Sequence, residues 1–348
     1  MPRRDLWTTV SPVDNRTQLS AVDGIVPPMR ELWRRRAVRH LVLSLVPLLL
    51  VGAVLMVVLS LRFVTVVTPV RQATAEAAAT VSRAGLGADG SEVELRWTDS
   101  GGGHHVSLVR VPDAARVRIG STATVHYVPS DPSRVYVGGD ATYIRLRNLA
   151  YDVFLVALLL VVVVAVSAVH VLRRRAAERR PGHPVPVTYA RSRRGLVQRS
   201  WLLLNDTDRE WWVPVHWEPV LASTLARTPG TVHGRPLDDR VVAVEVHGTP
   251  IWQSGRKRPV APSGEVITTA TPWSKATQRR TEDADAPPPP AALARQFRAD
   301  AVLLVAAPML GLLWAYVDSS GAAGFVGSTA LFACVLLWLP SVVGTDPT

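Results

Sequence analysis

The sequence LVLSLVPLLLVGAVLMVVLSL at residues 41–61 decides the fold class, because it contains no Asp, Glu, Lys or Arg. A helix needs about 20 such residues to cross the hydrocarbon core of a bilayer. Residues 153–172 form a second run, and residues 301–317 and 325–343 form two shorter ones. The alternative, a buried helix of a soluble protein, is disfavoured for the first two runs because neither has a polar face. The sequence therefore predicts an α-helical membrane protein with four transmembrane helices.

The first apolar run is not expected to be a cleaved signal peptide. It follows a long polar segment, residues 1–38, and no clear small-x-small cleavage site comes after it. Residues 1–38 are rich in polar side chains with scattered prolines, a composition typical of disordered chain. We therefore expect a disordered N-terminus followed by the first transmembrane helix at 39–61.

Arginine side chains predict the orientation, because they gather beside the ends of the apolar runs that should face the cytoplasm. Under this positive-inside rule both termini lie in the cytoplasm, and residues 62–150 face outward. The location is then the cell (plasma) membrane, with several passes. The predicted membrane anchors, which include two interfacial tryptophans, are Arg34, Arg35, Arg36, Arg39, Arg173, Arg174, Arg175, Trp314 and Trp338.

Small residues recur every four positions in the third helix, at Ala307, Gly311 and Ala315. This spacing places them on one helix face, where they allow the backbone of another helix to approach closely. The fourth helix has Ser328 at the same spacing from a glycine. We therefore predict that the third and fourth helices pack through these faces, although chance recurrence of common small residues is an alternative.

The outward-facing residues 62–150 are predicted to form a small β domain of three to five strands. In residues 92–97, Val, Leu and Trp alternate with charged side chains, which indicates a half-buried strand. The Gly-rich turn at 98–103 then returns the chain as a second strand. Residues 69–81 are rich in alanine, and for them the sequence favours a short helix.

The run GSTATVHYVPSDPSR at residues 120–134, preceded by a Trp-containing strand and a Gly-rich turn, carries a family resemblance. It resembles an uncharacterised bacterial membrane-protein family of actinobacterial type, whose members hold an extracytoplasmic β domain of unknown function between two transmembrane helices. The resemblance covers about residues 40–172. It implies the fold and location of this part of the chain and carries no activity.

The inward-facing segment 173–278 is predicted to be a small β-barrel-like domain. Residues 173–298 contain 21 basic against 12 acidic side chains, and six of the eleven tryptophans of the chain. Alternation places Trp211 and Trp217 on one strand face and Trp212 on the other. The Pro-Gly-containing start of a later strand, at 229–234, is similar to small barrels of the oligonucleotide/oligosaccharide-binding type.

Three interpretations of this basic inner domain remain open. Stacking of bases on tryptophan with attraction of phosphate would bind single-stranded nucleic acid, but tryptophans on alternating strand positions more often lie in a core, so nucleic acid is an unlikely partner. Arginine beside a membrane also attracts anionic lipid headgroups. An unspecific solvated surface is the third interpretation. The remaining predicted segments are a second transmembrane helix at 151–172, an acidic and Pro-rich linker at 279–298, a third helix at 299–317, an outer hairpin loop at 318–324, a fourth helix at 325–343 and a cytoplasmic tail at 344–348.

The sequence predicts no catalytic residue, no cofactor-binding residue and no metal ligand. Cys334 is the single cysteine, which excludes an internal disulfide and a cysteine-based zinc site. His104 and His105 are adjacent on a predicted strand and point to opposite faces, so the alternative of a two-histidine site would need His126. Charged groups deep in the helices, which transport usually requires, are not present in the runs.

The favoured function is therefore that of a non-catalytic structural or accessory envelope protein. Its partners would be the lipid bilayer, anionic lipid headgroups and an unidentified protein. The alternative is an enzyme, or a subunit of a transport complex, whose site is not recognisable from motifs.

Overall fold

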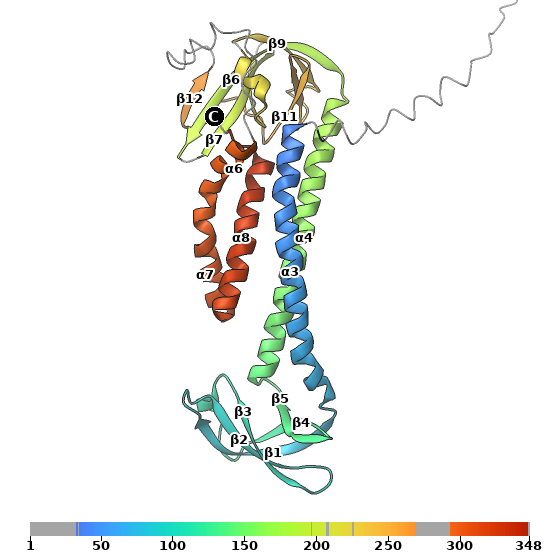
Figure 1. The fold of residues 1–348 in the computed structure, drawn as a ribbon, viewed down its shortest axis with the longest axis vertical. Helices are drawn as coiled ribbons and strands as arrows, with labels where there is room; N and C mark the ends of the chain where they lie inside the picture. The colour runs from blue at the N-terminus through green and yellow to red at the C-terminus, as the bar shows by residue number, and fades with distance from the viewer. Residues whose placement is uncertain are drawn as a thin grey trace, which may run out of the picture. The chain divides into compact units, whose positions relative to one another are not determined.

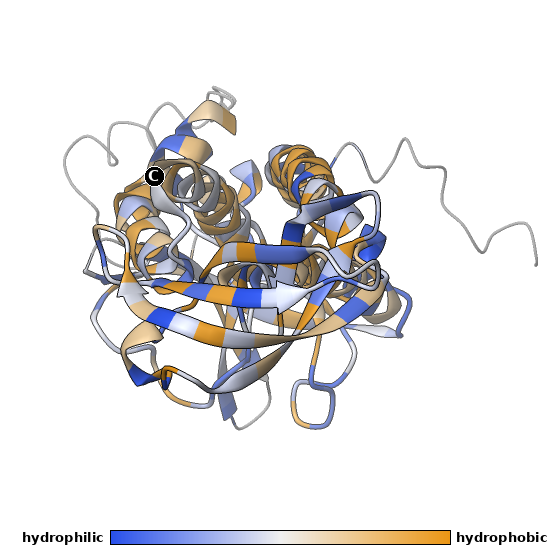
Figure 2. Ribbon diagram, turned by 90° about the horizontal axis from the view of Figure 1, so that it is seen from below, coloured by the Kyte–Doolittle hydropathy of each residue, from blue (hydrophilic) through white to orange (hydrophobic). Residues whose placement is uncertain are grey.

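The computed structural model describes residues 33, 35–195, 197–206, 209–224, 226–268 and 293–346. Four helical segments in this part of the chain are long and apolar enough to cross a membrane, as predicted. They are α3 (Arg36–Gln72), α4 (Ala141–Glu178), the continuous segment Leu293–Asp318 and α8 (Gly321–Val343). In Figure 2 the helices seen end-on are mostly orange, whereas the strands alternate between orange and blue.

The third segment consists of α6 (Leu293–Asp300), the 3-10 helix η3 (Ala301–Ala306) and α7 (Ala307–Asp318). Pro308 stands in the first turn of α7, where its missing N–H group costs no hydrogen bond. Ser319 ends α7 in the left-handed conformation, and α8 begins two residues later, within the predicted loop 318–324.

The residues fall into two compact units. One comprises residues 44–173 and 300–342, with most of the helices and the first β domain; the other comprises residues 33–43, 174–299 and 343–346 of the described chain, with the second β domain. Inside the first unit, Ser44 Oγ donates to Ser341 Oγ at 3.0 Å. A side chain on Gly52 would meet Leu160, so α3 and α4 pack closely there.

The first β domain is one antiparallel sheet in the order β3-β2-β1-β4-β5 (Figure 1). Its strands are β1 (Ala75–Leu86), β2 (Glu92–Thr98), β3 (His104–Arg110), β4 (Thr122–Val128) and β5 (Asp131–Val137). The alternating residues Val93, Leu95 and Trp97 of β2 are buried on the inner face, as the sequence pattern predicts. The five strands fall within the predicted number.

The predicted short helix at 69–81 is wrong from residue 75 onward. Residues 70–72 end helix α3, and β1 begins at Ala75. Alanine has a high helix propensity, but tertiary context overrides propensity, and here the strand is paired on both sides, by β2 and by β4. Ala79 and Val81 are buried in the sheet core, so burial on one face decides the structure against local propensity.

The second β domain is a seven-stranded sheet in the order β11-β10-β9-β6-β7-β8, with β12 paired to β6. Its strands are β6 (Gly182–Arg194), β7 (Val197–Asp206), β8 (Arg209–Val215), β9 (Thr228–His233), β10 (Ala243–Val246), β11 (Thr249–Trp252) and β12 (Glu265–Thr268). Bridges from Val215 to Gln253 and from Trp212 to Arg258 join β8 to the chain just after β11. The sheet therefore almost closes into a barrel.

Two apolar clusters lie on the two faces of the β7–β8 region. Val213, Val215 and Trp217 belong to the large interior cluster, with Trp211 packed against it. Trp212 packs with Trp201 in a second, smaller cluster. The structure thus confirms that Trp212 faces away from its two neighbouring tryptophans. The sequence missed β11 and β12, each of which has only four residues.

Candidate functional site

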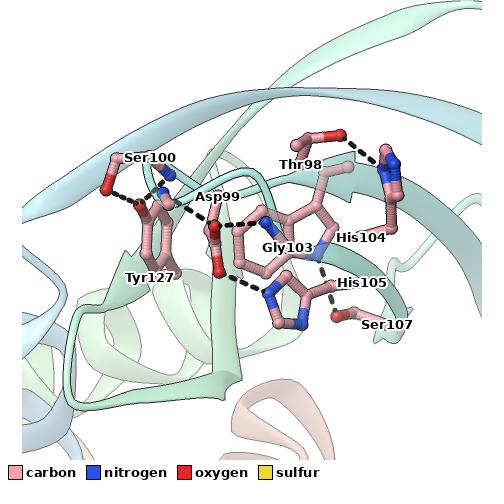
Figure 3. Close-up of polar contacts among 10 residues, drawn as sticks. Thr98, Asp99, Ser100, Gly103, His104, His105, Ser107 and Tyr127 are labelled. Atoms are coloured by element: carbon pink, nitrogen blue, oxygen red, sulfur yellow. Dashed lines mark hydrogen bonds and ion pairs between the residues drawn. The ribbon is translucent and has the colours of Figure 1, made fainter.

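A polar cluster occupies the β2–β3 hairpin of the first β domain (Figure 3). Asp99 Oδ1 accepts hydrogen bonds from the backbone N–H groups of Gly101 at 2.9 Å and Gly103 at 2.8 Å. Its second carboxylate oxygen lies 2.7 Å from His105 Nε2. The hydrogen bonds from His105 and Gly103 hold the pKa of Asp99 below its usual value. One carboxylate therefore organises the whole turn.

Aromatic side chains of β2, β3 and β4 pack beside this turn. The ring of His105 stacks on Trp97 with centroids 4.6 Å apart, and Trp97 Nε1 donates to Ser107 Oγ at 3.1 Å. Tyr127 OH accepts from the backbone N–H of Ser100 at 3.1 Å. These groups contact one another within the hairpin and strand β4, which is the arrangement of a stabilised turn.

The three histidines of the first β domain have three different partners. His104 Nδ1 lies 3.0 Å from Thr98 Oγ1, His105 pairs with Asp99, and His126 Nδ1 lies 3.4 Å from a carboxylate oxygen of Glu76. Within the part of the chain that the structure describes, no group of three or more His, Cys, Asp or Glu side chains is placed to hold a metal ion.

The second candidate site is the helix-end junction, which we define as the contacts of the second β domain with the chain ends of α3, α4, α6 and α8. At α4, Glu178 forms an ion pair with Arg35 and accepts a hydrogen bond from Trp252 Nε1 at 2.5 Å. The Arg35 guanidinium also lies 5.3 Å from the centre of the Trp252 ring. These contacts connect the start of α3, the end of α4 and strand β11.

The start of α3 contacts the residues just before the 3-10 segment η2 (Pro219–Ser223). Glu218 Oε1 accepts from the backbone N–H of Ala37 at 3.4 Å, in the first helical turn, where N–H groups have no partner within the helix. The Arg36 guanidinium lies 4.8 Å from the centre of the Trp217 ring. Burial raises the pKa of Glu218 to about 7, against the opposing effect of the Ala37 hydrogen bond and of nearby arginines.

The chain after α8 is bound to the same β domain. The side chain of Asp346 is fully buried, and its Oδ2 accepts from Tyr189 OH at 2.6 Å, Arg191 Nε at 3.0 Å and Ser200 Oγ at 3.0 Å. Burial, followed by the charge of Asp346, raises the pKa of Tyr189. From α6, Gln296 Nε2 donates to the backbone oxygen of Thr345 at 2.9 Å.

Sequence reasoning missed this attachment and treated residues 344–348 as a simple tail. The available signal was that Asp346 is the single acidic residue after the last apolar run.

The predicted arginine anchors are brought together at this junction, apart from two. Arg34 lies outside the described residues, and Arg173 is exposed. Arg174 is buried and its Nε donates to the backbone oxygen of Gln253 at 2.5 Å. Arg35 and Arg36 make the contacts given above, and Arg39 and Arg175 are partly buried. Several of these arginines therefore contact protein rather than solvent.

The two predicted aromatic anchors differ in their surroundings. Trp314 on α7 is partly exposed and meets the ring of Phe332 edge to face. Trp338 on α8 is buried, and its Nε1 donates to Ser167 Oγ of α4 at 3.0 Å.

The predicted small-residue stripe of α7 faces α8. Ala307, Gly311 and Ala315 are the buried residues of α7, and Ser328 Oγ donates to the backbone oxygen of Gly311 at 3.1 Å. A Cβ atom on Gly311 would lie 2.8 Å from the backbone nitrogen of Thr329, so the close approach depends on glycine. Three of the four predicted helix-packing residues are thus buried on α7, and the fourth, Ser328, contacts Gly311.

No protein-family model, curated protein or solved structure matches the chain.

Proposed function

We propose that this chain is a multi-pass protein of the bacterial cell (plasma) membrane with both termini in the cytoplasm. In this orientation the first β domain is extracytoplasmic and the second is cytoplasmic. The proposal is supported by the arginines at the ends of α3 and α4, since positive side chains are retained on the cytoplasmic side. The resemblance of residues 40–172 to an uncharacterised envelope family gives the same placement of the first β domain.

The function proposed is non-catalytic: a structural or accessory protein that binds a protein partner through its β domains. One observation carries it, namely that the second β domain is bonded to the starts and ends of the helices at the helix-end junction. Glu178, Glu218 and Asp346 are each used for these attachments. A partner that bound this domain would thereby be held at a fixed place on the helix ends.

Anionic lipid headgroups are proposed as a second partner of the cytoplasmic face. Single-stranded nucleic acid is the less favoured alternative, because four tryptophans of the described domain are buried and cannot stack on bases. Trp201, Trp212, Trp217 and Trp252 are each less than 9% exposed in the second β domain. Base stacking needs exposed rings, so the basic charge of the domain is better explained by the nearby membrane surface.

Cysteine labelling tests the orientation. Cys334 is the single native cysteine, so Cys334→Ala provides a cysteine-free background. Ala115→Cys and Ala261→Cys then place exposed thiols in the first and the second β domain. A membrane-impermeant maleimide should label the Ala115→Cys protein in intact cells, and the Ala261→Cys protein only after permeabilisation. The opposite pattern would reject the orientation.

Affinity capture from native membranes tests the accessory function. The tag belongs at the N-terminus, because Asp346 near the other end of the chain is bound inside the second β domain. Recovery of one stoichiometric protein partner is the expected result. If that partner is lost on Asp238→Ala or Arg235→Ala, two exposed changes in the second β domain, this domain provides the contact. Recovery of the chain alone under mild extraction would contradict the partner-binding function.

A further inference from the structure

Among the residues that the structure describes, Arg39 and Arg175 have guanidinium nitrogens without hydrogen-bond partners. The unpartnered atoms are Nε of Arg39, and Nε and Nη2 of Arg175, and all three are shielded from solvent by protein. Buried polar atoms in folded proteins are nearly always hydrogen-bonded, and a guanidinium can only donate. These nitrogens therefore call for an acceptor.

The two arginines each stand one helical turn from the same ion pair of the helix-end junction. The ion pair between Arg35 and Glu178 joins the start of α3 to the end of α4. Arg39 is one helical turn after Arg35, and Arg175 is three residues before Glu178. Positions three and four apart lie on the same face of a helix, so Arg39 and Arg175 stand within one helical turn of this ion pair along the chain, on its side toward the apolar runs.

The acidic groups of the junction do not supply the acceptor. Glu178 accepts from Arg35 and from Trp252 Nε1, and Glu218 accepts from the backbone N–H of Ala37. Burial raises the pKa of Glu218 to about 7, so near neutral pH its carboxyl is only partly ionised. Glu218 interacts electrostatically with Arg39, but neither carboxyl accepts a hydrogen bond from the unpartnered nitrogens of Arg39 and Arg175.

We infer that Arg39 and Arg175 together bind one phosphate-type oxyanion at the helix-end junction. Guanidinium groups match the geometry of phosphate oxygens with paired donors, which an ammonium group does not. In the orientation proposed above, this end of α3 and α4 lies at the inner leaflet, where the phosphate of an anionic phospholipid is the nearest source. Inorganic phosphate has the same chemistry and is the second source. The lipid assignment rests on the proposed orientation, whereas the oxyanion site does not.

The test uses the full-length protein in nanodiscs of either phosphatidylcholine alone or phosphatidylcholine with phosphatidylglycerol. Retained lipid is measured by native mass spectrometry, and the unfolding temperature by tryptophan fluorescence. The variants are Arg39→Gln and Arg175→Gln. Arg173→Gln is the matched control, because it removes the same charge from an exposed position two residues before Arg175. The unfolding temperature in phosphatidylcholine alone checks that each variant folds; if Arg175→Gln fails this check, Arg175→Lys replaces it.

Wild type should retain phosphatidylglycerol and unfold at a higher temperature in its presence. A charged hydrogen bond is worth enough for each Gln variant to lower retention about tenfold or more, while Arg173→Gln should change it less than about twofold. An equal loss in Arg173→Gln, or no preference for phosphatidylglycerol in wild type, would overturn the inference. If millimolar inorganic phosphate stabilises wild type in phosphatidylcholine, with the same dependence on Arg39 and Arg175, the oxyanion site is supported and the lipid source is overturned.

Failure of this site can be distinguished from failure of the proposed orientation. Binding is measured on purified protein, which is open to both sides of the nanodisc, and it does not depend on topology in the cell. Loss of binding together with the expected maleimide pattern would therefore reject the oxyanion site alone.

Discussion

Replacing Asp346 by alanine should destabilise the second β domain, although Asp346 lies at the end of the chain. The change removes the acceptor of Tyr189 OH, Arg191 Nε and Ser200 Oγ. Removing one partner of a buried ion pair typically costs about 3 to 5 kcal/mol. Here the tail can lift away and admit water, and the Arg191 side chain is already 18% exposed, so we expect about 2 to 3 kcal/mol.

Urea unfolding of the full-length protein, followed by tryptophan fluorescence, measures this loss. The buried Trp201 and Trp217 report on the second β domain. With a urea dependence of about 2 kcal/mol/M, a loss of 2 to 3 kcal/mol lowers the midpoint by about 1 M or slightly more. Asp346→Asn keeps one acceptor oxygen and should lose about half as much.

Asp238→Ala is the matched control for Asp346→Ala. Its carboxylate is 62% exposed and lies 3.9 Å from Arg235, and such exposed pairs contribute less than about 1 kcal/mol. If Asp346→Ala moves the urea midpoint no more than Asp238→Ala does, the tail does not stabilise the second β domain and the reasoning is refuted.

Three further changes test other parts of the structure. Burial raises the pKa of Glu218 to about 7, so the stability that its protonation contributes is complete below pH 4.5 and is lost as the pH rises through about 7. Glu218→Gln should therefore make the urea midpoint nearly constant between pH 5 and 8. A variant whose midpoint depends on pH as strongly as that of wild type would contradict the raised pKa. In the first β domain the pKa of Asp99 is lowered, so the stability that its ionised carboxylate contributes is present above pH 3.8 and disappears as the pH falls through the lowered pKa. Asp99→Ala should speed amide hydrogen exchange in the β2–β3 turn about tenfold or more at pH 7. Unchanged exchange rates would contradict the role of Asp99 in holding this turn. Gly311→Ala places a Cβ atom against Thr329 and should lower the free energy of unfolding, measured by thermal denaturation, by about 1 to 3 kcal/mol. The control Gly138→Ala places its Cβ atom in open space and should be nearly neutral. Equal effects of the two changes would refute the close contact between α7 and α8.

The features that the sequence predicted are those whose physical cause is local. The apolar runs give helices by their length, and the alternation of Val93, Leu95 and Trp97 gives β2 by its period. Strand β1 was mistaken because alanine satisfies both periods equally, and only its pairing with β2 and β4 decides between them. Strands β11 and β12 are too short for a period to be recognised.

The attachments at the helix-end junction could not be predicted because they join residues far apart in the sequence. Asp346 bonds to Tyr189, which precedes it by 157 residues, and Glu178 bonds to Arg35 across 143 residues. Such pairs leave no local pattern. The arginines were visible in the sequence, but their number alone indicated orientation and gave no information about which of them contact protein.

The burial of these arginines argues that they do more than set the orientation. A cation that served only to keep one helix end in the cytoplasm would be most stable in water, because burying a charge without a partner is costly. Arg35 and Arg174 repay their burial by bonding to Glu178 and to the backbone oxygen of Gln253, and so they hold the second β domain on the helices. Arg39 and Arg175 are partly buried, and within the described residues their shielded nitrogens have no hydrogen-bond acceptor. The physical requirement that explains the first pair therefore supports the oxyanion proposed for the second.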